Sequence, residues 1–159
     1  MGMHELSAVL WRERELLDVL LYKLDLERLL LVTSQHRWLG RAAHEIEYVT
    51  ARLKEVGLTR AVESAEVADE LGIDPAATLR ELVEATADDV WRDILSGHLT
   101  ALGAATGEIA ELRDANERML RAAAGPAAAA HGTAPGGATY DARGLMDEVR
   151  DATLVDEEI

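Results

Sequence analysis

Two long segments carry apolar side chains at intervals of three, four or seven residues, and neither segment has a proline in its interior. This spacing keeps the side chains on one face of an α-helix, which an internal proline would break. The segments span residues 4–56 and 75–124, so each helix would have about 50 residues and a length of ~75 Å. The matching lengths predict an all-α fold, in which two long antiparallel helices form a coiled-coil-like hairpin with a short helix at the turn.

Each long segment has a predicted core stripe. The first stripe consists of Leu6, Leu10, Leu17, Leu20, Leu24, Leu31, Trp38, Ala42, Ile46, Val49, Leu53 and Val56. The second consists of Leu79, Val83, Ala87, Val90, Ile94, His98, Ala101, Leu102, Ala105, Ile109, Leu112, Asn116, Met119 and Ala123. In an antiparallel pair of these helices, Trp38 would lie near Trp91. Trp11 would lie near Met119, at the open end of the hairpin.

The first long helix has one weak point and one predicted end. The weak point is Val32–Ser34, where β-branched and hydroxyl residues lower helix propensity. Whether the helix breaks there stays open at this stage. Gly57 is the predicted residue after the C-terminus, because glycine adopts the left-handed conformation that ends many helices.

The interval between the long helices contains a predicted short helix. It spans about residues 60–71, with Thr59 as its N-cap and Gly72 as its end. Asp74-Pro75 follows, an N-cap residue beside a proline suited to the first helical position. This dipeptide is the predicted start of the second long helix.

The composition changes after residue 124. We predict a helical hairpin domain over residues 1–124, a flexible Ala/Gly/Pro linker over 125–139 and an acidic tail over 140–159. The tail has a short amphipathic pattern, formed by Leu145, Met146, Val149, Ala152 and Val155. A helix this short is marginal alone in water, so the pattern favours a segment that folds on binding over an inert tail.

Charge and composition restrict the partners. The formal net charge of −14 disfavours nucleic acids and anionic membrane surfaces, which are themselves negative. The longest apolar run is Leu29–Val32, far short of a membrane span, and the N-terminus does not resemble a secretory signal. There is no cysteine, which fits a reducing compartment. We therefore expect a cytoplasmic protein without membrane insertion.

No motif for catalysis or metal binding is present in the sequence. His44-Glu45 begins like a zinc protease motif, but the second histidine four residues after His44 is missing. Nucleophile elbows and phosphate loops are also absent. His98 lies on the predicted core stripe, where a structural role is the default. We therefore predict that the protein is not an enzyme and has no catalytic residue, metal or cofactor.

The order of the segments resembles the FlgN family of flagellar type III export chaperones, in the form seen in actinobacteria. The resemblance spans about residues 4–124 and rests on LWRERELLDVLLYKLDLERLLL, HRWLGRAAHEIEYV, LRELVEATADDVWRDIL and EIAELRDANERMLRAA. The stretch most typical of the family is LRDANERML, over residues 112–120. A second asparagine often precedes Asn116 by three residues in the family, and Arg113 stands there in this chain.

The resemblance implies a cytosolic chaperone that binds the C-terminal helix of hook–filament junction proteins. Such a chaperone prevents premature assembly and delivers its client to the type III export gate. The implied client-binding residues are Leu112, Asn116, Met119, Leu120, Tyr140, Leu145, Met146 and Val149. The alternatives are a non-enzymatic coiled-coil adaptor, whose apolar stripes pair in a homodimer, and a metal-binding helical bundle.

Overall fold

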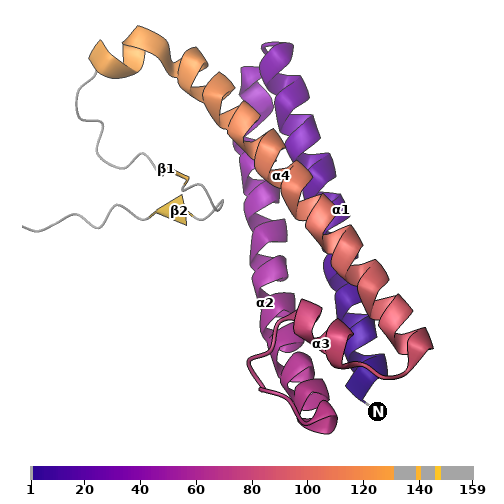
Figure 1. The fold of residues 1–159 in the computed structure, drawn as a ribbon. Coiled ribbons are helices and arrows are strands. Elements are labelled where there is room, and N and C mark those ends of the chain that lie inside the picture. The colour runs from indigo at the N-terminus through magenta and orange to yellow at the C-terminus, as the bar shows by residue number, and fades with distance from the viewer. Residues whose placement is uncertain (1, 131–138, 141–145, 148–159) are drawn as a thin grey trace, which may run out of the picture.

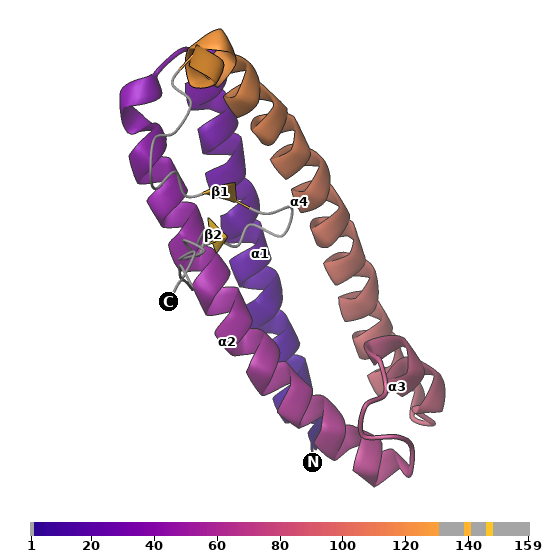
Figure 2. The ribbon, with the colours of Figure 1, turned by 90° about the vertical axis from the view of Figure 1, so that its left-hand side faces the viewer.

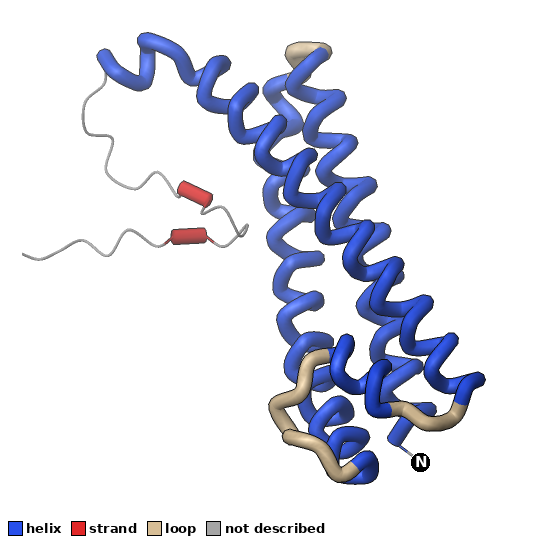
Figure 3. The backbone as a smooth tube through the Cα atoms, viewed as in Figure 1, coloured by secondary structure: helices blue, strands red, loops and turns tan. Residues whose placement is uncertain are grey.

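The computed structural model describes residues 2–130, 139–140 and 146–147 (Figure 1). The elements are α1 (Gly2–Val32), the 3₁₀-helix η1 (His36–Trp38), α2 (Leu39–Leu71), α3 (Leu79–Ala85), α4 (Asp89–Ala130), β1 (Thr139–Tyr140) and β2 (Met146–Asp147). Apart from this antiparallel pair of two-residue strands, every regular element is a helix (Figure 3). The predicted all-α class is therefore confirmed.

The antiparallel hairpin in the structure is formed by α1 and α2. Lys23 Nζ donates to Glu45 Oε2 over 2.7 Å, and near the middle of the pair Arg60 Nη1 donates to Glu13 Oε1 over 2.9 Å. At the far end, the backbone nitrogen of Gly2 donates to Glu70. The residue numbers rise along α1 as they fall along α2, so the two helices run antiparallel over the whole length of α1.

Helix α4 runs parallel to α1. The ring of His4 lies 4.6 Å from that of Trp91, measured between centroids, whereas Asn116 bonds to the carbonyl oxygen of Leu24 much further along both helices. Figure 2 shows α1 between α2 and α4, and Figure 1 shows α4 crossing obliquely over α1. The predicted hairpin of two ~50-residue helices with its turn near residues 57–75 is therefore wrong, because each predicted helix contains a break.

The first break lies at the predicted weak point, between α1 and α2. Ser34 adopts a positive φ of 56°, and its backbone nitrogen donates to the carbonyl oxygen of Leu31. The nitrogen of Gln35 donates to the carbonyl of Leu30 over 2.8 Å. Two such bonds around a left-handed residue end the helix as a Schellman motif. Thr33 assists by donating its hydroxyl to the carbonyl of Leu29.

The predicted helix end at Gly57 is wrong, because α2 continues through it to Leu71. One internal glycine costs about 1 kcal/mol relative to alanine. Continued packing on α1 offsets that cost, since Val56, Val67 and Ala68 are all buried. The predicted end at Gly72 is confirmed: Gly72 has a φ of 69°, and its neighbour Ile73 donates to the carbonyl of Ala68.

The predicted helix start at Asp74-Pro75 is also wrong. Asp74 accepts a bond from the nitrogen of Ala76 and forms a turn, and α3 begins five residues after Asp74, at Leu79. Its N-cap is Thr78, whose hydroxyl accepts from the Glu81 nitrogen while the Glu81 carboxylate accepts from the Thr78 nitrogen. This capping box satisfies two backbone donors at the helix start. The Glu81 carboxyl has a lowered pKa because these bonds favour its charged form.

The second break, between α3 and α4, shifts the apolar register. Arg92 Nε donates to the carbonyl oxygen of Thr86 over 2.9 Å, and this bond stabilises the loop between α3 and α4. The predicted stripe ran unbroken across this point, so it wrongly included Val90, which is 68% exposed, and Ile94. The buried residues are instead Leu82 of α3 and Leu95 of α4.

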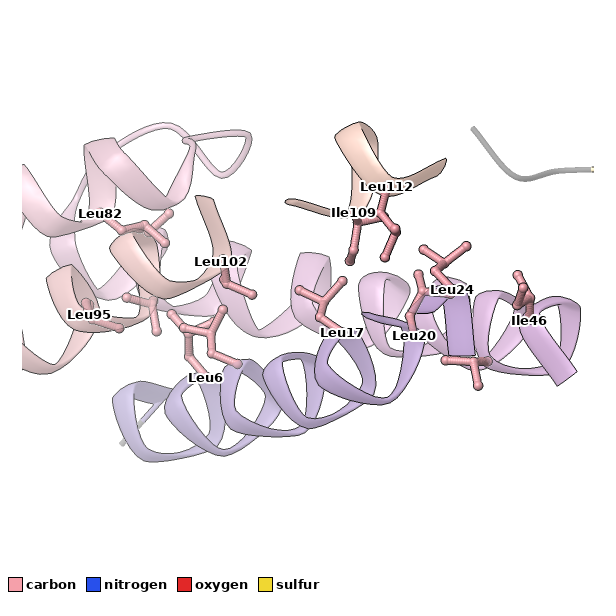
Figure 4. Packing of buried hydrophobic residues seen from close by; sticks show 14 residues of the cluster. Leu6, Leu17, Leu20, Leu24, Ile46, Leu82, Leu95, Leu102, Ile109 and Leu112 are labelled. Carbon is pink, nitrogen blue, oxygen red and sulfur yellow. The ribbon is translucent and has the colours of Figure 1, made fainter. Parts of the chain in front are cut away.

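The core follows the inner face of α1 and receives side chains from all the other α-helices. Figure 4 shows the cluster, with Leu82 of α3 and Leu95 of α4 at the same end as Leu6 and with Ile46 towards the other end. The buried members are Leu6, Leu10, Leu17, Leu20, Leu24, Ile46, Val49, Val67, Ala68, Leu82, Leu95, Leu102, Ile109 and Leu112. The cluster confirms five predicted leucines of the first stripe, at positions 6, 10, 17, 20 and 24, whereas Leu53 is only partly buried against the cluster and Leu31 is buried outside it. Trp38 is not part of it and is 46% exposed, because it lies in η1 at the turn.

Helix α4 changes direction near its end. Gly125 has φ 39° and ψ −152°, which are not helical values, and residues 126–130 resume the helix after this kink. The helical part therefore extends five residues into the range predicted as a linker. Residues 131–138 of that range lie outside the described residues.

Candidate functional site

The C-terminal half of α4 is held on α1 by one buried asparagine. Asn116 is 1% exposed, and its Nδ2 donates to the Leu24 carbonyl oxygen and to Glu27 Oε2, each over 2.9 Å. A polar pair in an apolar seam fixes the register of two helices, because any slip would leave both groups buried without partners. The sequence placed Asn116 on the core stripe, and the structure confirms its burial there.

Glu27 is a residue that the sequence reasoning missed. It is 9% exposed and lies three residues after Leu24 and four before Leu31, on the buried face of α1. Burial raises the pKa of its carboxyl, and the bond from Asn116 and the charge of Arg113 oppose this rise. The position of Glu27 within the leucine spacing was a signal that could have identified it.

Replacing Glu27 with glutamine tests this account of the seam. The raised pKa means that the folded protein holds the carboxyl proton more tightly than the unfolded chain, so ionisation lowers stability as pH rises from the ordinary value of 4.5. Glutamine can still accept from Asn116 and never ionises. We expect Glu27→Gln to equal or exceed the wild type in stability at pH 7, by up to about 1 kcal/mol, with a smaller difference at pH 4.5. Urea denaturation at both pH values measures it, and a large loss of stability at pH 7 would contradict it.

A second polar contact joins the other ends of α1 and α4. His98 is 1% exposed, its Nε2 lies 3.2 Å from Ser7 Oγ, and its ring meets that of Trp11 edge-on at 5.1 Å between centroids. Burial and the charge of Arg14 lower the pKa of His98, which favours the neutral form of the ring in the seam. This agrees with the structural role expected for His98.

Trp11 does not lie near Met119, as the antiparallel pairing predicted. It contacts His98 instead, about twenty residues earlier in α4, because α4 runs parallel to α1. The predicted approach of Trp38 to Trp91 is wrong for the same reason, since Trp91 contacts His4 near the start of α1.

The structure divides the predicted client-binding residues of α4 into two pairs. Leu112, 7% exposed, and Asn116 are buried against α1, so a client would reach them only if this part of α4 moved away. Met119 and Leu120 are half-buried, near the level at which α1 ends. Beyond them α4 projects past the α1–α2 pair (Figure 1).

The structure describes two of the four predicted client-binding residues in the tail. Tyr140 in β1 and Met146 in β2 are partners across the short antiparallel ladder. Leu145 and Val149 lie outside the described residues.

Two further features of the described residues concern metal binding and membrane insertion. They contain no group of three or more histidines and carboxylates positioned to hold a metal ion. In the same part of the chain, no helix combines the length and apolarity needed to cross a bilayer.

Comparison with known proteins rests on one finding. The family model described as FlgN protein matches residues 1–126, which is most of the chain and includes all the helices that form the core. The chain belongs to the FlgN family. FlgN proteins are flagellar export chaperones and not enzymes. Neither the curated proteins nor the solved structures that were searched contain a match to this FlgN chain.

Proposed function

We propose that this FlgN protein is a cytosolic chaperone for hook–filament junction proteins. It binds their C-terminal helical segment, prevents premature assembly and delivers them to the type III export gate. Membership of the FlgN family carries this proposal, since the family consists of flagellar export chaperones.

The end of α4 and the residues that follow form the proposed client site. Met119 and Leu120 keep part of their apolar surface accessible where α4 leaves the α1–α2 pair. A client helix with apolar residues at a spacing of three or four would cover that surface. Tyr140, Leu145, Met146 and Val149 are proposed to complete the site from the tail, which the sequence pattern suits to folding on binding.

Leu112 and Asn116 are assigned a supporting part in this site. Their side chains are buried against α1, and Asn116 is hydrogen-bonded there. They hold α4 in register, so that the Met119–Leu120 pair is presented at the end of the bundle. Client contact at these two positions would require the seam to open.

Substitution of the presented pair tests the proposal. We expect the double variant Met119→Asp, Leu120→Asp to bind the C-terminal segment of a junction protein from the same host with an affinity lower by about tenfold or more. A loss of this size is typical of substitutions at a binding hot spot. Isothermal titration calorimetry measures the affinity, and circular dichroism verifies that helix content is kept. Leu58→Asp is the matched control, since Leu58 is 72% exposed on α2.

Two outcomes would count against the proposal. Equal affinity of the double variant and the wild type would remove the α4 end from the site. Recovery of no flagellar axial protein with the tagged wild type from its own host would favour the alternative, a coiled-coil adaptor without export clients.

A further inference from the structure

The outer face of the α1–α2 hairpin carries apolar side chains that stay exposed among the residues that the structure describes. On α1 the buried side chains recur at positions 17, 20, 24, 27 and 31, facing α2 and α4. A second stripe is offset from them and points away from the seam with α4. Together with one tryptophan from the turn it forms what we call the hairpin-tip surface: Val19, Tyr22, Leu26, Leu29, Leu30 and Trp38.

Much of this surface is accessible. Tyr22 is 64% exposed, Leu29 is 58% exposed and Trp38 is 46% exposed. Leu26 and Leu30 are half-buried and line a hollow of about 170 Å³ between the two helices, together with Trp38, Arg41, Ala42 and Glu45. Exposed apolar residues that gather around a hollow, rather than being scattered singly, mark an interaction site.

The charge around the hairpin tip differs from that of the rest of the chain. The protein has 30 acidic and 16 basic residues, yet no acidic residue occurs between Glu27 and Glu45. That interval contains Arg28, Arg37 and Arg41. The guanidinium of Arg37 lies 5.0 Å above the Trp38 ring. The Arg41 side chain is 75% exposed, and its Nε donates to Glu45 Oε1 over 3.1 Å, while Lys23 Nζ donates to the other oxygen of the same carboxylate. Lys23, Arg37 and Arg41 therefore outnumber the one carboxylate beside the hollow.

We propose that the hairpin-tip surface binds an amphipathic helix of a protein partner, with carboxylates along the edges of the helix's apolar face. The hollow receives an apolar anchor between Leu26, Leu30 and Trp38. Arg37 pairs with a carboxylate at the edge, and Arg41 is shared between Glu45 and a second carboxylate of the partner. The surface lies on α1 and the turn, apart from the client site proposed at the end of α4, so it provides for a second partner.

Charge decides between this occupant and a second copy of the chain. A basic partner would meet the arginines at the tip, and like charges across an interface are unfavourable. In a symmetric dimer formed through this surface, the arginines of both copies would lie together, which is unfavourable for the same reason. An acidic amphipathic helix satisfies both the apolar hollow and the basic rim.

Two labelled 18-residue peptides test the proposal on the full-length chain. Both have leucines at a spacing of three and four; one has glutamates beside the leucines and the other has lysines at the same positions. Fluorescence anisotropy gives the affinities. We expect the glutamate peptide to bind about tenfold more tightly than the lysine peptide, as two or three exposed ion pairs would produce. Added salt should reduce this difference.

Matched variants test whether the peptides bind at the hairpin-tip surface. Arg37→Glu with Arg41→Glu should abolish or reverse the preference for the glutamate peptide, and Leu29→Glu should weaken binding of both peptides. Leu58→Glu, at the exposed residue of α2 used as a control above, should change neither.

Four results would overturn the proposal. The first is equal affinity for the two peptides, and the second is equal loss in the Leu29→Glu and Leu58→Glu variants. The third is the absence of saturable binding, as expected if the chain's own C-terminal residues fill the hollow. Sedimentation of the wild type as a dimer that Leu29→Glu dissociates would likewise assign the surface to a second copy.

Discussion

Asn116→Asp is expected to lower the free energy of unfolding by about 3 kcal/mol at pH 7, the scale for a buried charge without a compensating partner. The substitution removes the Nδ2 donor that serves Leu24 and Glu27 and places a second carboxylate against the first. Within the described residues Asn116 Oδ1 has no hydrogen-bond partner, so no donor is already aimed at the new oxygen. Urea denaturation followed by circular dichroism measures the loss.

The pH dependence distinguishes this mechanism from simple loss of packing. Two adjacent buried carboxyls share a proton, so the pKa of the pair rises in the folded state. A raised folded-state pKa means that stability returns as pH falls. The deficit of Asn116→Asp should therefore be smaller at pH 5 than at pH 7. A deficit that does not change with pH would contradict the account.

A double variant provides the matched control. Glu27→Gln combined with Asn116→Asp exchanges the amide and the carboxylate between the two positions. The amide of the new glutamine can then donate to the new carboxylate, so we expect more than half of the lost stability to return. No recovery would show that the bond to the Leu24 carbonyl, and not the pair, holds α4 in place.

Leu6→Ala is expected to lower the free energy of unfolding by about 2–5 kcal/mol, the range for a large apolar side chain removed from a rigid core. Leu6 is fully buried, at the end of the core where the leucines of α3 and α4 meet α1. A cavity there removes contacts from several elements at once, and a short helix such as α3 is not stable by itself. Thermal and urea denaturation give the change.

The matched control for this variant is Leu58→Ala. The same number of atoms is removed at an exposed helical position, so the expected change is within about 0.5 kcal/mol. Similar effects of the two substitutions would contradict the assignment of Leu6 to the core.

Local sequence signals located two of the helix ends. The hydroxyl-rich Val32–Ser34 segment marked the break between α1 and α2, and Gly72 marked the end of α2. The Thr78–Glu81 capping box was also present in the sequence, although the neighbouring Asp74-Pro75 dipeptide was chosen as the helix start instead. Gly57 misled the prediction because the cost of one glycine is smaller than the gain from packing along α1.

The candidate site was only partly accessible to sequence reasoning. The spacing placed Asn116 on the buried face. Its partner Glu27 is a charged residue, and the predicted stripe of α1 contained only apolar residues. The half-buried state of Met119 and Leu120 depends on where α1 ends beside them, and no pattern within α4 contains that information.

The amino-acid sequence by itself determined the all-α class, the buried stripe of α1 and the resemblance to the FlgN family, because all three depend on the order and spacing of residues along the chain. The tertiary structure decided the direction in which α4 packs. Apolar stripes are compatible with parallel and antiparallel neighbours alike, and a three-residue break between α3 and α4 resets which face is buried. The contacts of His98 with Ser7 and of Asn116 with Glu27 stabilise the parallel arrangement, because they give partners to two buried polar side chains of α4.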